Sequence, residues 1–135
     1  MKWNKSLETG DALVDEQHKE IFRLVQQVLD ADTFTNPKEK IETAMGFLSD
    51  YAVRHFASEE ALMRECNYPE YNNHKGLHDN FVKEVIAFIG RYAVEGDSIS
   101  ITDTINNFVL EWLKDHIMGH DKAMAEFYKE YMAKK

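Results

Sequence analysis

Cysteine, proline and glycine are scarce in this sequence, which has one cysteine, two prolines and six glycines among 135 residues. A lone Cys66 cannot form a disulfide within the chain, so we expect a packed, inert thiol in a reducing cytoplasm. Few prolines and glycines interrupt the chain, which favours long helices. The first six residues contain no apolar run typical of a signal peptide, and no stretch is long enough to span a bilayer.

Basic residues are also in the minority, with 16 against 24 acidic residues and a formal net charge of −8. This balance argues against nucleic acid or an anionic membrane surface as a partner. Hydrophobic residues make up 44% of the chain and charged residues 30%, which is typical of a globular domain with room for one core. We therefore expect a single domain over residues 1–135. No surface pattern marks an interface, so we expect a monomer.

Four long segments carry apolar residues at alternating spacings of three and four, the pattern of an amphipathic helix. The expected helices cover residues 11–29, 38–65, 70–93 and a fourth segment from about residue 101 to Gly119. We expect an irregular arm before them and a short terminal helix over residues 122–132 after them. Short loops between the four helices predict an all-α, up-down-up-down antiparallel four-helix bundle.

Turn and cap residues mark the boundaries of these helices. Pro37 suits a first helical turn, and Ser100 followed by Asp103 resembles a capping box. The breaks are expected at residues 30–37, 67–69 and 95–98, which are rich in asparagine, aspartate, proline or glycine.

Five of the six histidines lie on the apolar faces of the four helices, in company with two carboxylates. The set is His18, His55, Glu59, His74, His78, His116 and Asp121. Burying such groups without a partner costs several kcal/mol, and metal ions are the partners that suit this mixture. Within the set, each pair that is four residues apart shares one helix face. Folding would bring residues from all four helices to one interior region.

Asp121 is the ligand candidate that is hardest to place. It lies five residues after His116, and five residues rotate by about 140° away from a common face in an α-helix. A helix end at Gly119 would swing Asp121 back toward the core.

Counting ligands indicates a pair of metal ions. If both carboxylates bridge two six-coordinate ions and a solvent oxygen bridges them as well, one coordination position stays open. Three histidines would bind the closed ion and two the open one. Imidazole and carboxylate suit iron, zinc or manganese. Iron is favoured for a redox role, because dioxygen could bind to the ferrous pair without changing the net charge of a buried site.

The sequence resembles bacterial hemerythrins over nearly its whole length. The motifs that carry the resemblance are Val14-Asp15-Glu16-Gln17-His18-Lys19, His55-Phe56-Ala57-Ser58-Glu59-Glu60, Tyr68-Pro69, His74 with His78, and His116-Ile117 with Asp121-Lys122. The resemblance implies reversible binding of dioxygen at two iron ions bridged by an oxo or hydroxo group, in an oxygen carrier, store or sensor.

The resemblance also implies a role for each ligand. His74, His78 and His116 would bind the six-coordinate iron, and His18 and His55 the open iron. Glu59 and Asp121 would bridge the two ions. Trp112, Leu113 and Met118 would lie near the oxygen pocket.

Three functional classes follow from these residues: an oxygen-binding protein, a di-iron enzyme that handles peroxide or nitric oxide, and a structural bundle with incidental histidines. The structural reading would leave seven polar groups buried without compensation. The enzyme reading is weakened by the excess of histidines over carboxylates, and no acid or base is evident beyond the ligands. We therefore expect no enzymatic function beyond a weak peroxidase-type side activity.

Two polar residues next to the ligand set are not expected to bind metal. We expect Glu60 to face solvent and His120 to lie at the surface.

Overall fold

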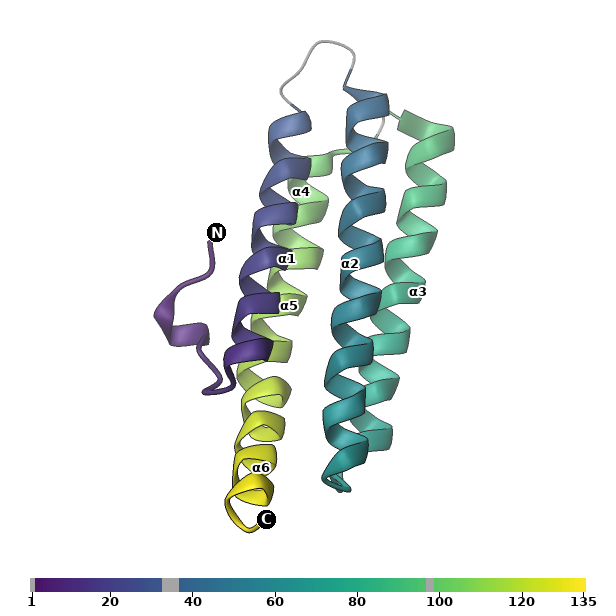
Figure 1. The fold of residues 1–135 in the computed structure, drawn as a ribbon. Helices are drawn as coiled ribbons and strands as arrows, with labels where there is room; N and C mark the ends of the chain where they lie inside the picture. The colour runs from purple at the N-terminus through teal and green to yellow at the C-terminus, as the bar shows by residue number, and fades with distance from the viewer. Residues whose placement is uncertain (1, 33–36, 97–98) are drawn as a thin grey trace.

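The computed structural model describes residues 2–32, 37–96 and 99–135, and these form four long helices packed side by side (Figure 1). The chain runs alternately up and down, and the described residues contain no strand, which confirms the all-α bundle. None of the described helices is both long and apolar enough to cross a membrane. The helices are α1 (Ala12–Ala31), α2 (Lys38–Glu65), α3 (Tyr71–Glu95), and a fourth rod of α4 (Ile101–Thr104), η3 (Ile105–Leu110), α5 (Glu111–His116), η4 (Ile117–Asp121) and α6 (Lys122–Ala133).

The ends of the helices follow from the cap residues. The side chain of Asp11 accepts a hydrogen bond from the Val14 amide at the start of α1, at 2.9 Å. Ser100 does the same for the Asp103 amide at the start of α4, at 3.2 Å, as the sequence predicts. Pro37 immediately precedes the first residue of α2. Residues 33–36 and 97–98 of the two predicted turns lie outside the described residues.

The fourth rod differs from the prediction at Gly119. The helix does not end there, because η4 is a π-helical turn through which α5 continues directly into α6. In a π-helical turn the backbone bonds join residues five apart instead of four. His116 and Asp121 are five apart, so the wider turn returns Asp121 to the face that carries His116. The predicted short terminal helix is therefore the last part of one continuous rod.

Two apolar clusters of unequal size fill the bundle. The larger one takes buried side chains from residues within the ranges 21–31, 41–56, 81–92 and 101–117, at the end of the bundle where α1 and α3 finish and α2 and α4 begin. The smaller one consists of Val14, Met63 and Met124. Cys66, at the end of α2, is buried, and burial raises the pKa of its thiol, as expected of an inert cysteine.

The arm before α1 is tied to the bundle at three points. Leu7 is buried in the large apolar cluster. The backbone amide and the hydroxyl of Thr9 both donate to the buried carboxylate of Asp15, each at 2.8 Å. Lys122, the first residue of α6, donates to the backbone carbonyl of Ser6 at 2.6 Å. The arm therefore joins the start of α1 to the segment that carries Asp121.

Candidate metal centre

All seven ligand candidates meet in the interior, between the two apolar clusters. None of their side chains is more than 4% exposed. α1 supplies His18, α2 supplies His55 and Glu59, α3 supplies His74 and His78, and the fourth rod supplies His116 and Asp121. Their ligand atoms form two overlapping groups, each within 4.8 Å: His18, His55, Glu59 and Asp121 in one, and His74, His78, His116, Glu59 and Asp121 in the other.

Each carboxylate offers one oxygen to each group. Glu59 Oε2 lies 2.9 Å from His55 Nε2 and 3.4 Å from His18 Nε2. Its Oε1 lies 3.1 Å from His78 Nε2 and 3.6 Å from His74 Nε2. The two oxygens therefore face opposite groups, as the oxygens of a bridging carboxylate do.

Asp121 divides its oxygens in the same way. Its Oδ2 lies 2.9 Å from His18 Nε2, whereas its Oδ1 lies 3.0 Å from His74 Nε2 and 3.1 Å from His116 Nε2. The three nitrogens of the larger group also crowd one another, because His116 Nε2 is 3.0 Å from His74 Nε2 and 3.1 Å from His78 Nε2. Nitrogens at such distances, with no room for a proton on each, suit a shared cation.

Several of these atoms are close to one another without forming hydrogen bonds of ordinary geometry. Among the described residues, the buried Nε2 of His18 and both oxygens of Glu59 have no hydrogen-bond partner, although they lie within ion-pair distance of opposite groups. These atoms lie close together without the alignment that a hydrogen bond requires. Ligand atoms around a central metal ion have this arrangement. A metal ion would satisfy them, so the donor set fits a pair of cations.

Without metal, the carboxylates change the protonation of the histidines. Burial alone would lower the pKa of His18, but its polar contacts with Asp121 and Glu59 outweigh burial and raise the pKa to about 9. The same balance raises the pKa of His74 to about 9. At His116 burial prevails, helped by the neighbouring His78, and the pKa falls below its ordinary value.

The two carboxylates show the reciprocal effect. Burial, and for Asp121 also the charge of Glu59, would raise the pKa of each. The surrounding imidazoles prevail: His55 and His18 hold the pKa of Glu59 well below its usual range, and His116 and His18 do the same for Asp121. Both carboxyls therefore stay ionised at neutral pH, which is the state that binds metal.

Two of the ligand histidines have partners on their outer nitrogens that were not evident from the sequence. His55 Nδ1 donates to the side-chain oxygen of Gln17 at 2.8 Å. His78 Nδ1 donates to Glu60 Oε2 at 2.9 Å. Glu60 is 13% exposed, so its carboxylate faces solvent only in part and, contrary to the expectation, also contacts a ligand histidine. His120 is half-buried, with its ring centroid 5.4 Å from that of His116.

The three residues predicted near an oxygen pocket lie in different surroundings. Trp112 stacks on the His116 ring at 4.4 Å between centroids and 10° between planes. Leu113 is buried in the large apolar cluster. Met118 is 47% exposed, so the structure does not bring this side chain into the interior with the others.

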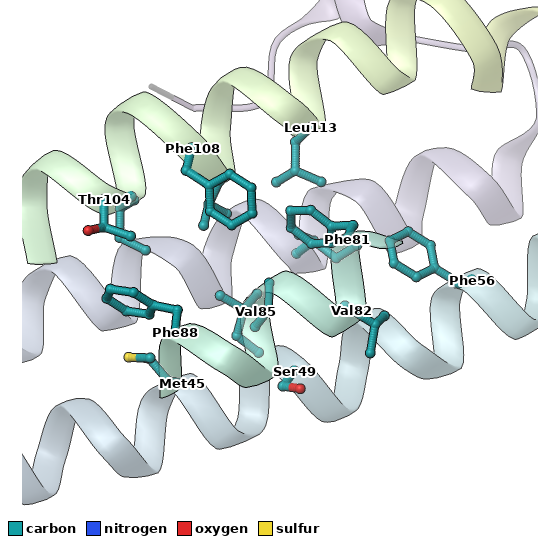
Figure 2. A pocket seen from close by; sticks show the side chains of 15 residues that line it. Met45, Ser49, Phe56, Phe81, Val82, Val85, Phe88, Thr104, Phe108 and Leu113 are labelled. Atoms are coloured by element: carbon teal, nitrogen blue, oxygen red, sulfur yellow. The ribbon is translucent and has the colours of Figure 1, made fainter. Parts of the chain in front are cut away.

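An apolar cavity of about 30 Å³ lies next to the metal centre, between α1, α2, α3 and the fourth rod (Figure 2). At one end it is lined by Phe56, Phe81 and Leu113. Phe56 also stacks on the ligand His78, with ring centroids 4.0 Å apart. The cavity continues past Val85 to Phe88 and the π-helical segment η3. An apolar space of this kind stays dry, so it borders the metal centre with a wall that excludes water.

Comparisons with known proteins point to one family. A model of the hemerythrin HHE cation binding domain matches residues 9–128. The chain is 31% identical over 130 residues to the bacteriohemerythrin of Stenotrophomonas maltophilia, covering 96% of this chain and 82% of that one. It is 28% identical over 131 residues to the bacteriohemerythrin of Pseudomonas aeruginosa, covering 97% and 83%. A crystal structure of wild-type hemerythrin superposes with a TM-score of 0.84 at 29% identity, covering 95% of this chain and 97% of that one.

Proposed function

Because this chain belongs to the hemerythrin family, we propose that it binds dioxygen reversibly at a pair of non-haem iron ions, as an oxygen carrier, store or sensor. The observation that carries the proposal is the division of the ligands. Two carboxylates each present one oxygen to a group of three histidines and one to a group of two. Such a division leaves the two-histidine position one ligand short.

Each side chain has a definite task in this proposal. His74, His78 and His116 would hold one ion, and His18 and His55 would hold the other, which would keep an open position. Glu59 and Asp121 would be shared by the two ions, together with a solvent-derived oxo or hydroxo group. When bound, the two irons supply the electrons and the open coordination position that reversible binding of dioxygen requires.

Apolar residues around the centre would keep water and stray protons away from the two ions. Leu113 and Phe56 contribute to the apolar cavity beside the centre, and Trp112 covers the His116 ring. In a dry site a bound ligand has no ready proton donor, which favours its release unchanged. This is the condition for reversible binding instead of turnover.

An enzymatic role would need an acid or base that faces the open position. Among the described residues and apart from the ligands themselves, the titratable side chains that contact ligand histidines by a hydrogen bond or a ring contact are Glu60 and His120. Glu60 contacts His78, and His120 contacts His74 and His116, so both belong to the three-histidine group. This placement supports binding over catalysis.

The test measures iron per chain and then cycles the reduced protein between air and argon. We expect two irons and a charge-transfer absorption band that appears in air and disappears under argon. Zinc as the native metal, or a band that never reverses, would contradict the proposal. His18→Ala should remove iron from the open position, whereas His120→Ala, the matched control on a histidine that is no ligand, should keep both irons.

A further inference from the structure

The two metal positions have outer partners of different charge. His55, in the two-histidine group, donates its Nδ1 proton to the neutral amide of Gln17. His78, in the three-histidine group, donates its Nδ1 proton to the carboxylate of Glu60. The distances, 2.8 and 2.9 Å, are nearly the same, so the two contacts differ in charge and not in length.

The orientation of Gln17 is fixed by a chain of hydrogen bonds. Its side-chain amide nitrogen donates to Ser58 Oγ at 3.3 Å, and the Ser58 hydroxyl donates to the backbone carbonyl of Arg54 at 3.1 Å. With the nitrogen committed to Ser58, the oxygen of the amide faces His55. The two helices that meet here, α1 and α2, thus hold a neutral acceptor against the open position.

Glu60 lies in a different environment. It stands next to Glu59 on α2 and lines a surface hollow of about 250 Å³, together with His78 and Asp79 of α3. Solvent therefore reaches one side of the carboxylate, which lowers the cost of keeping its charge. The other side meets the imidazole of a ligand.

A carboxylate accepts a stronger hydrogen bond from an imidazole than an amide does, and it makes that imidazole a better electron donor to a metal. We infer that Glu60 and Gln17 are positioning residues that make the two metal positions unequal, with Glu60 favouring the more highly charged ion at the three-histidine position. The inference depends on the proposed function only in requiring two metal ions at this site. It does not require that they bind dioxygen.

The first test uses the zinc-loaded protein, which is diamagnetic, and measures the NMR shifts of the imidazole Nδ1 protons. We expect the proton of His78 to lie further downfield than that of His55. Glu60→Gln keeps the hydrogen bond and removes the charge, so it should move the His78 signal upfield and leave the His55 signal in place. Gln17→Glu adds a charge, so it should move the His55 signal downfield and leave the His78 signal in place. Equal shifts in the unaltered protein, or a His78 signal that ignores Glu60→Gln, would overturn the inference.

The second test titrates the iron-loaded protein with dithionite in the presence of mediator dyes. Each electron from dithionite reduces one ferric ion to ferrous, so two midpoint potentials are measured. The three-histidine ion should be reduced at the lower one. Glu60→Gln should raise the lower midpoint potential, and Gln17→Glu should lower the upper one. Either variant should therefore reduce the difference between the two potentials. Identical shifts of both potentials would indicate a general charge effect and would overturn the inference.

Two further variants separate charge from structure. If Glu60 served only to hold His78 in place, Glu60→Gln would behave like the unaltered protein and only Glu60→Ala would be impaired. We expect both to raise the lower potential, and Glu60→Ala to weaken zinc binding about tenfold in addition. The control variant Glu84→Gln removes the same charge from an exposed position on α3. It should change neither the NMR shifts nor the difference between the two midpoint potentials. If the zinc-loaded protein shows the expected shifts but the iron-loaded protein binds no dioxygen, the proposed function is contradicted and this inference still stands.

Discussion

In the absence of metal ions, protons bound to histidines supply the positive charge at the centre. His18 and His74 are held in the protonated state by the ionised Glu59 and Asp121, so opposite charges balance inside the bundle. Metal binding must displace those protons, because a ligating imidazole needs its lone pair. At the scale of single residues, metal affinity and pH are therefore linked.

We expect Zn²⁺ binding to the metal-free protein at about pH 7.5 to release protons from both His18 and His74. Their pKa values are about 9 in the folded protein, so both are charged at that pH. Calorimetric titrations in buffers of different ionisation enthalpy measure the release. It should decrease as the pH rises above 9, and an enthalpy independent of the buffer would contradict the prediction.

The same pKa shifts determine the stability of the metal-free fold. The raised pKa values of the two histidines contribute stability that is complete below their ordinary value of 6.5 and is lost as the pH rises through about 9. The lowered pKa values of Glu59 and Asp121 contribute stability above their ordinary values of 4.5 and 3.8, which is lost on acidification. The lowered pKa of His116 adds stability as the pH rises toward 6.5, so urea unfolding should show greatest stability in the upper part of the range from about pH 4.5 to 6.5.

At the scale of elements, the π-helical turn η4 decides where Asp121 lies. Gly119, within that turn, is exposed and has no positive φ, and a Cβ added there would meet open space. Nothing in its conformation requires glycine, in contrast to Gly96 at the end of α3, whose φ is +54°. Two glycines that look alike in the sequence therefore have opposite structural roles.

Gly119→Ala should stabilise the metal-free protein by up to about 1 kcal/mol, since alanine favours the helix. Metal content should stay the same. Gly96→Ala should destabilise the protein by about 1 kcal/mol, because an alanine is strained at positive φ. Urea unfolding of both variants measures the difference. Destabilisation by Gly119→Ala would mean that the rod ends there after all.

Most of the elements were predictable from local signals, and the exceptions have a physical cause. Proline, capping residues and regular apolar spacing marked the helices, and the same spacing selected six of the seven clustered side chains. Asp121 was placed through a helix end at Gly119 that the structure does not have, and through the resemblance, because α-helical rotation turns it away from His116 and a π-helical turn has no clear sequence signal.

Glu60 was misplaced for a related reason. One residue after the inward-facing Glu59, it points about 100° away on α2 and was assigned to solvent. Side-chain spacing on one helix does not say where the neighbouring helix packs, and α3 brings His78 to that side. Met118 shows the converse, since the resemblance placed it near the oxygen pocket and its side chain is 47% exposed.

At the scale of the whole molecule, all four helices depend on one centre. Removing metal leaves seven buried polar groups to satisfy one another, so the loaded protein should be more stable by about 4 kcal/mol for each bound ion at metal concentrations a thousandfold above Kd. For a chain of this length that corresponds to a Tm higher by about 10 °C or more. Thermal unfolding of the zinc-loaded and metal-free proteins measures the difference, and equal Tm values would contradict the prediction.

The polar layer between the two apolar clusters has a consequence for local unfolding. Val14, Met63 and Met124 lie beyond the ligands on α1, α2 and the fourth rod, separated from the large cluster by seven polar side chains. These two regions belong to separate apolar clusters, so we expect them to unfold as separate cooperative units in the metal-free protein. Amide hydrogens around Met63 and Met124 should then exchange with solvent by a low-energy opening that leaves the rest of the bundle protected. Metal would merge the two units, so the exchange rates of both ends would become those of a single unfolding event.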